Sequence, residues 1–161
     1  MGKPEMLEND PIAVAKSKAY RRQMVPEHLW RHPTRAAIDA LALRFDLPNH
    51  HSMQDWEWEV ADPNRLDDFI GAYQSGELND DELFTLMEMI VQSFDNLGGA
   101  VSRDPRWRTA RDLLDTNIRI HAHTVWYWSC PEMDAAEEQW AITPFIRPIF
   151  EKNRARLLPC N

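Results

Sequence analysis

Residues 79–99, NDDELFTLMEMIVQSFDNLGG, decide the fold of this chain. Asn79 and Glu82 have near-capping-box spacing, and the acidic residues that open the segment favour the positive end of a helix dipole. Large apolar side chains then recur every three or four positions and form one continuous face, which consists of Leu83, Phe84, Met87, Ile90, Val91, Phe94 and Leu97. Gly98 and Gly99 follow at once, so the segment predicts an amphipathic helix with a defined start and stop.

Residues 62–76, DPNRLDDFIGAYQSG, predict a second helix directly before it. Asp62 can cap this helix, and Pro63 suits the first helical position. Its apolar stripe consists of Leu66, Phe69, Ile70 and Tyr73. Gly76 can end it, and only a short turn separates it from the next helix. We therefore expect an antiparallel helical hairpin over residues 62–97.

Two further helices are indicated on either side of this hairpin. Residues 33–48 show helical spacing of their apolar side chains between two prolines, which predicts a helix there. Asp104 and Pro105 repeat the opening pattern of the hairpin, and helical periodicity continues from them almost to Pro131. The pattern predicts one long helix near 105–128.

The ends of the chain are less regular. Two shorter helices are expected over 132–142 and from Thr143 or Pro144 onward, with the start of the last one left open by Pro148. Residues 1–25 are weakly periodic and predict either a helix or a loosely ordered basic arm. No repeat, low-complexity tract or flexible linker divides the 161 residues. The chain is therefore expected to be a single all-α domain, a bundle of about five to seven helices.

One stretch resembles a strand. Residues 56–60, WEWEV, alternate apolar and acidic side chains as a half-buried strand would. No partner strand exists elsewhere in the sequence, and an isolated strand has little stability. We therefore expect residues 54–61 to be an extended segment laid across the helices.

Composition limits the classes of function. Apolar residues make up 43% and charged residues 27%, a globular balance with no run long enough to span a membrane. The net charge of −8 argues against direct nucleic-acid binding, which needs a basic surface. Cys130 and Cys160 have neither metal-type spacing nor the density of a disulfide framework, so the expected location is a reducing cytoplasm.

Residues 118–130, IRIHAHTVWYWSC, concentrate aromatic and histidine side chains. On a helical wheel His121 falls on the apolar face, where a neighbour such as Asn117 would bond it. His123 falls on the opposite side, so the pair could chelate a metal only if the segment were a strand. Trp126 falls on the polar side and is a candidate binding anchor, unless another helix covers it.

The sequence contains no established catalytic motif. There is no nucleophile elbow, phosphate-binding loop or calcium loop, and we expect neither metal nor cofactor. His28 and His32 have the spacing of a zinc-binding helix but lack its glutamate. The loose arginine–histidine spacing of helical nucleases of the HEPN type occurs twice, from Arg22 to His28 and from Arg44 to His50, but each time a proline intervenes. An alternative function is a small metal-assisted hydrolase or nuclease, whose histidines would have to converge from His28, His32, His50, His51 and His123.

The acidic residues form a block. Residues 54–97 contain twelve acidic residues and one basic residue, a net charge of −11. Such a surface would steer a basic partner, and tryptophans within it would supply contact area. The candidate partner-binding residues are Asp55, Trp56, Glu57, Trp58, Glu59, Asp62, Asp80, Asp81, Glu82 and Trp126.

The sequence thus favours a non-enzymatic, acidic protein-binding module whose partner is a basic protein. In size, acidity and absence of a catalytic motif it is similar in type to bacterial immunity proteins, which neutralise basic nuclease toxins, although no motif links them residue by residue. A further alternative is a homodimeric structural protein, since the 105–128 helix has apolar residues beyond those of one face, among them Leu113, Ile120 and Tyr127.

Overall fold

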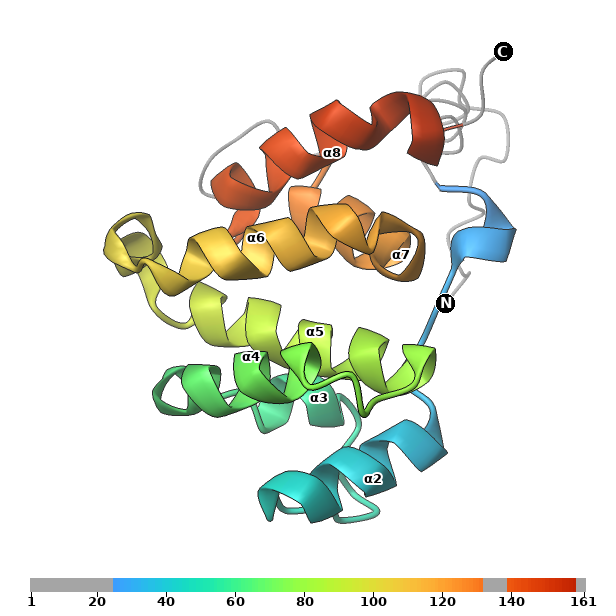
Figure 1. Cartoon of the computed structure of the whole chain (residues 1–161), viewed down its shortest axis with the longest axis vertical. Coiled ribbons are helices and arrows are strands. Elements are labelled where there is room, and N and C mark those ends of the chain that lie inside the picture. The colour runs from blue at the N-terminus through green and yellow to red at the C-terminus, as the bar shows by residue number, and fades with distance from the viewer. Residues whose placement is uncertain (1–24, 132–138, 159–161) are drawn as a thin grey trace, which may run out of the picture.

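A computed structural model describes residues 25–131 and 139–158 of the chain, and these residues form helices and connecting turns without a strand (Figure 1). The longer helices are α2 (Arg35–Phe45), α4 (Leu66–Gln74), α5 (Asp80–Asp95), α6 (Arg106–Thr116), α7 (Ile118–Ser129) and α8 (Thr143–Leu157). A single helical turn, α3 (Trp56–Glu59), and short 3-10 helices connect them. The all-α prediction is confirmed. Residues 1–24 of the predicted basic arm and 132–138 of the helix predicted over 132–142 lie outside the described residues.

Helix α5 is the centre of the fold. In Figure 1 it lies between α2, α3 and α4 on one side and α6, α7 and α8 on the other, and it contacts α2, α3, α4, α6 and α7. Every residue from Phe84 to Val91 is buried. The sequence indicated one apolar face, but α5 is covered around its whole circumference, as expected of a helix in the middle of a core.

The local start and stop signals act as predicted. Asn79 Oδ1 accepts from the Glu82 backbone N–H at 2.9 Å, and Glu82 Oε1 accepts from that of Asn79 at 3.1 Å, which completes the capping box of α5. Asp62 Oδ1 accepts from the backbone N–H of Asn64 at 2.9 Å, at the start of the turn that leads into α4. Gly76 has a φ of 75°, which permits the reversal between α4 and α5. The hairpin over 62–97 is confirmed.

The predicted long helix near 105–128 is wrong in one respect, because Asn117 divides it into α6 and α7. Asn117 leaves helical geometry at φ −106° and ψ 34°, and its side-chain amide donates to the carbonyl of Leu113 at 3.0 Å. Asparagine competes in this way with backbone hydrogen bonds. In Figure 1, α7 does not continue the line of α6. Trp126, which the helical wheel placed on the polar side, is covered in the structure and only 9% exposed.

The predicted extended segment over 54–61 is also wrong. Residues Trp56–Glu59 form one helical turn, in which the backbone N–H of Val60 donates to the carbonyl of Trp56 at 3.0 Å. Trp56 points into the core and donates its indole N–H to the carbonyl of Pro48 at 2.6 Å. The alternating pattern misled because five residues are too few to separate a period of two from a helical turn.

Histidine 121 is buried as predicted, but its partner lies on another helix. The Tyr73 hydroxyl of α4 is 2.5 Å from Nε2 of His121, instead of the expected contact with Asn117. Burial, with a smaller effect of the Arg31 charge, lowers the pKa of His121 to about 3, so the ring is neutral in the folded protein. Within the described part of the chain, no helix has the length and apolar character needed to cross a membrane.

Candidate functional site

A cavity of about 360 Å³ lies where α3, α5, α7 and the segment before α2 meet. Its size is that of a small-ligand site. Charged, imidazole and aromatic groups line it, among them Arg31, His32, Glu57, Trp58, Glu88, His123 and Tyr127. We call this cavity the Glu57 pocket.

Glu88 forms the inner wall of the Glu57 pocket. It belongs to α5, is 5% exposed, and accepts three hydrogen bonds. The Thr124 hydroxyl donates to Oε1 at 2.6 Å, and the indole N–H groups of Trp58 and Trp128 donate to Oε2 at 3.1 and 3.0 Å. Burial raises the pKa of Glu88, and these three donors oppose that rise. Because Trp58 is on α3 and the other donors are on α7, this carboxyl group joins three helices.

Glu57 has a different environment. It is 8% exposed and lines the same cavity, yet its carboxyl group receives no side-chain hydrogen bond and forms no ion pair with any described residue. Burial raises the pKa of Glu57 to about 7, against a lowering by its own backbone N–H, and the negative charges of Glu88, Asp55 and Glu59 raise it further. Glu57 is thus a largely buried acid that lines the cavity, and among the described residues the hydrogen-bond donor to its carboxyl group is its own backbone N–H.

Histidine and aromatic side chains form the rest of the lining. The rings of His32 and His123 meet edge to face with centroids 5.7 Å apart. Burial, and then the neighbouring His32, lower the pKa of His123, which favours its neutral form. Tyr127 stacks on Trp58 at 5.7 Å and on Trp140 at 4.9 Å. This aromatic cluster fixes the wall formed by α7.

The positive charge nearest to the pocket is already engaged. Arg31 lies in the lining, and its guanidinium donates to Asp81 at the start of α5, at 2.7 Å. Arg31 forms no ion pair with the carboxyl group of Glu57 or Glu88, because its guanidinium is paired with Asp81. The pocket interior therefore retains two acidic groups without a bound basic side chain from the described residues.

The structure gives the predicted partner-binding residues different surroundings. Asp55, just before α3, and Glu57 and Trp58 on α3 line the pocket; Asp55 and Glu59 are exposed, whereas Trp56 belongs to the core. The remaining residues have local roles or are covered: Asp62 and Glu82 cap helix starts, Asp80 is exposed beside Asp81, and Trp126 is buried. Because Trp56 and Trp126 are buried, the prediction that they are exposed contact residues is wrong.

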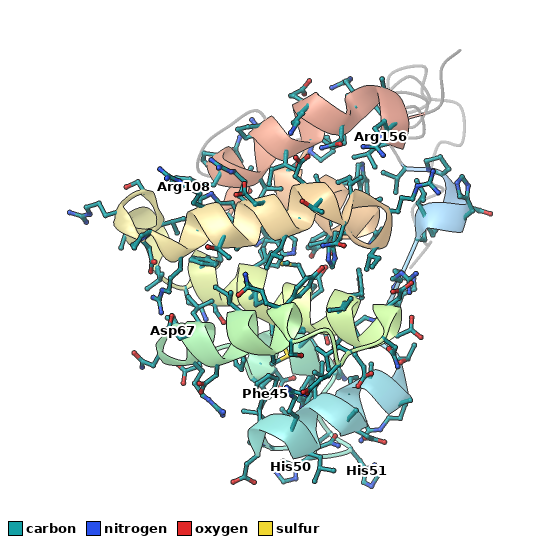
Figure 2. All side chains as sticks on the ribbon, in the orientation of Figure 1. Phe45, His50, His51, Asp67, Arg108 and Arg156 are labelled. Atoms are coloured by element: carbon teal, nitrogen blue, oxygen red, sulfur yellow. The ribbon has the colours of Figure 1, made fainter. Side chains whose placement is uncertain are left out.

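Three acidic residues of the block pair with arginines from other segments, and a fourth pairs with Arg65 inside the block. The ion pairs are Arg31–Asp81, Arg44–Glu77, Arg65–Asp68 and Arg106–Asp67. Figure 2 shows Asp67 at the edge of α4, where Arg106 lies 3.5 Å away. The net charge of −11 counted along residues 54–97 thus overstates the negative charge of the folded surface.

Of the five histidines considered for a metal site, only His32 and His123 come together. His50 and His51 are exposed in the loop after α2, at the lower end of the view in Figure 2. His28 lines a separate cavity with Arg119 and Arg156. In the described ranges, no three histidine, cysteine or acidic side chains are placed to hold a metal ion.

Sequence reasoning overlooked Glu88. Its signal was present, because Glu88 interrupts the apolar run between Met87 and Met89, and a charged residue at a buried position requires partners. The sequence does not indicate which residues these partners are, since Trp58, Thr124 and Trp128 are all distant from Glu88 in sequence.

Comparisons of the chain with protein-family models, curated proteins and solved structures find no match.

The Glu57→Gln substitution is expected to stabilise the protein at high pH. The folded-state pKa of about 7 lies above the ordinary value of 4.5, so the folded state binds more protons between these values and stability falls as pH rises through them. Glutamine removes that penalty, and urea denaturation should show a gain of about 1–3 kcal/mol at pH 8 but less than about 1 kcal/mol at pH 5. Glu59→Gln, on the exposed side of α3, should show no such difference. A loss of stability for Glu57→Gln at pH 8 would contradict the assignment.

Proposed function

We propose that the protein is a binding module for a basic partner protein, and that a positively charged side chain of the partner enters the Glu57 pocket. The observation that carries this proposal is Glu57 itself, which is 8% exposed, lines a cavity and has no partner among the described side chains. A buried acid without a partner lowers stability, so its presence at a cavity favours a role in binding.

The charge distribution supports a basic partner. Asp55 and Glu59 are exposed on either side of Glu57 in the sequence, and neither forms an ion pair with a described residue. Together with the net charge of −8, they would attract and orient a basic surface. A basic side chain that reached Glu57 would be removed from water and paired, which is the arrangement of a strong interface contact.

In this proposal the specific contact lies in a pocket, whereas the sequence predicted that an exposed acidic strip would make the contact. The ion pairs of the acidic block reduce the negative charge that an acidic strip could offer to a partner. Glu57 and Trp58, by contrast, line the pocket and remain candidate contact residues. A pocket of this kind suits an immunity-like protein that holds a basic toxin by one inserted side chain, and this remains the partner type that we favour.

The proposal is tested with an arginine-rich peptide of eight residues as the basic probe. We expect Glu57→Gln to weaken its binding about tenfold or more in isothermal titration calorimetry, because the buried charge pair is lost. Glu59→Gln is the matched control, since it removes the same charge two residues away at an exposed position, and it should change affinity by about threefold at most. Equal losses in both variants would show that only general acidity attracts the peptide and would overturn the proposal.

A further inference from the structure

We propose that the Glu57 pocket selects groups with several N–H donors, a guanidinium or a primary ammonium, and that Glu57 releases its proton to solvent as such a group enters. This inference rests on the proposed function in taking the same pocket as the binding site. It adds the chemical class of the ligand and a proton exchange linked to binding.

A ligand in the Glu57 pocket would meet the carboxyl groups of Glu57 and Glu88. Glu88 already accepts from Thr124 at 2.6 Å and from the indoles of Trp58 and Trp128 at 3.1 and 3.0 Å, so its oxygens are largely used. Glu57, 8% exposed, has no side-chain donor in the described part of the chain. A ligand would therefore meet a carboxyl group that is bonded by its own backbone N–H alone, and the remaining acceptor sites are best satisfied by a planar or compact group with more than one N–H.

Aromatic faces alone do not explain how this pocket would recognise a cation. Tyr127 stacks between neighbours at 5.7 Å (Trp58) and 4.9 Å (Trp140), and the indole N–H of Trp58 is donated to Glu88. Quaternary ammonium ions are bound through open aromatic faces. Because Tyr127 already stacks on two neighbours and the pocket offers the carboxyl group of Glu57, a cation without N–H groups should bind more weakly than one that can donate to this carboxyl group.

The surroundings of Glu57 control its proton. Ionisable groups face Glu57 from every adjoining element of the pocket: Asp55 just before α3, Glu59 on α3, Glu88 on α5, Arg31 and His32 before α2, and His123 and Tyr127 on α7. Burial and the acidic members of this set keep a proton on Glu57 up to about neutral pH, since its pKa is raised to about 7. An entering cation favours the ionised carboxylate, so the O–H bond of Glu57 breaks and the proton passes to water.

The test uses methylguanidinium and tetramethylammonium as probes, with the indole N–H resonance of Trp58 as the NMR reporter. We expect the affinity for methylguanidinium to rise about tenfold between pH 6 and pH 8, as a site that must lose a proton near pH 7 requires. Tetramethylammonium should bind at least about tenfold more weakly at pH 8. In Glu57→Gln the pH dependence should disappear, while Glu59→Gln should retain it.

Failure of this inference is distinguishable from failure of the proposed function. If the arginine-rich peptide binds through Glu57 but the two small cations bind equally, the donor selectivity is overturned and the proposed function stands. A pH dependence that persists in Glu57→Gln would assign the titration to another group and overturn the proton release. If methylguanidinium binds as expected but the peptide does not, the inference stands and the protein-binding function fails.

Discussion

Phe94→Ala is expected to lower the free energy of unfolding by about 3–5 kcal/mol, the usual range for removing a buried phenylalanine. Phe94 is fully buried near the end of α5 and packs edge to face against Trp107 of α6, with ring centroids 5.2 Å apart. The substitution would leave a cavity between α5, the central helix, and the start of α6. Urea denaturation followed by circular dichroism measures the loss.

Leu43→Ala is the matched control for the core substitution. Leu43 lies on α2 and is 86% exposed, so its removal should change the free energy of unfolding by less than about 0.5 kcal/mol. Both changes truncate a large apolar side chain to alanine, and the two side chains lie at opposite extremes of burial. A loss below about 1 kcal/mol for Phe94→Ala would show that α5 is not packed at this end.

Helix boundaries set by local chemistry could be read from the sequence. The capping box of Asn79 and Glu82, the Asp62 cap and the reversal at Gly76 each involve residues within three positions of one another. Such contacts form in any chain with these residues and need no distant partner. The hairpin between α4 and α5 followed from them.

The break at Asn117 and the turn at Trp56 could not be read in the same way. The apolar spacing of residues 105–128 continues through Asn117, although the backbone leaves helical geometry there and the side chain bonds to the carbonyl of Leu113. Apolar periodicity does not register such a local side-chain contact. Trp56 is buried in the core, where its indole N–H donates to the carbonyl of Pro48, and this packing favoured one helical turn over an extended segment.

The candidate site was predicted only in part. Glu57 and Trp58 were named, but as members of an exposed strip, because alternation of charge and tryptophan does not tell which side faces solvent. The pocket also needs His32, Glu88 and His123, which are brought together from three separate segments. Periodicity indicates faces of single elements, and it contains no information about which faces meet.

Glu88→Ala is expected to destabilise the protein by about 3–5 kcal/mol. It leaves the hydroxyl of Thr124 and the indole N–H groups of Trp58 and Trp128 without their acceptor. A buried donor without a partner costs about 1–3 kcal/mol, and relief of the burial of the Glu88 carboxyl offsets part of the sum. The effect should appear in urea denaturation and in a loss of the near-ultraviolet circular dichroism of the tryptophans.

Glu88→Gln separates this structural role from binding. Glutamine has nearly the same shape and keeps one carbonyl acceptor for the indoles, so the loss should be about 1 kcal/mol. Equal losses for the alanine and glutamine variants would show that the hydrogen bonds do not join α3, α5 and α7. Glu57 and Glu88 can be compared directly, because both line the same pocket and burial raises the pKa of both carboxyl groups. Above pH 7, replacement of Glu88 should destabilise the fold and replacement of Glu57 by glutamine should stabilise it, because the first has three partners in the fold and the second has its proposed partner in the ligand.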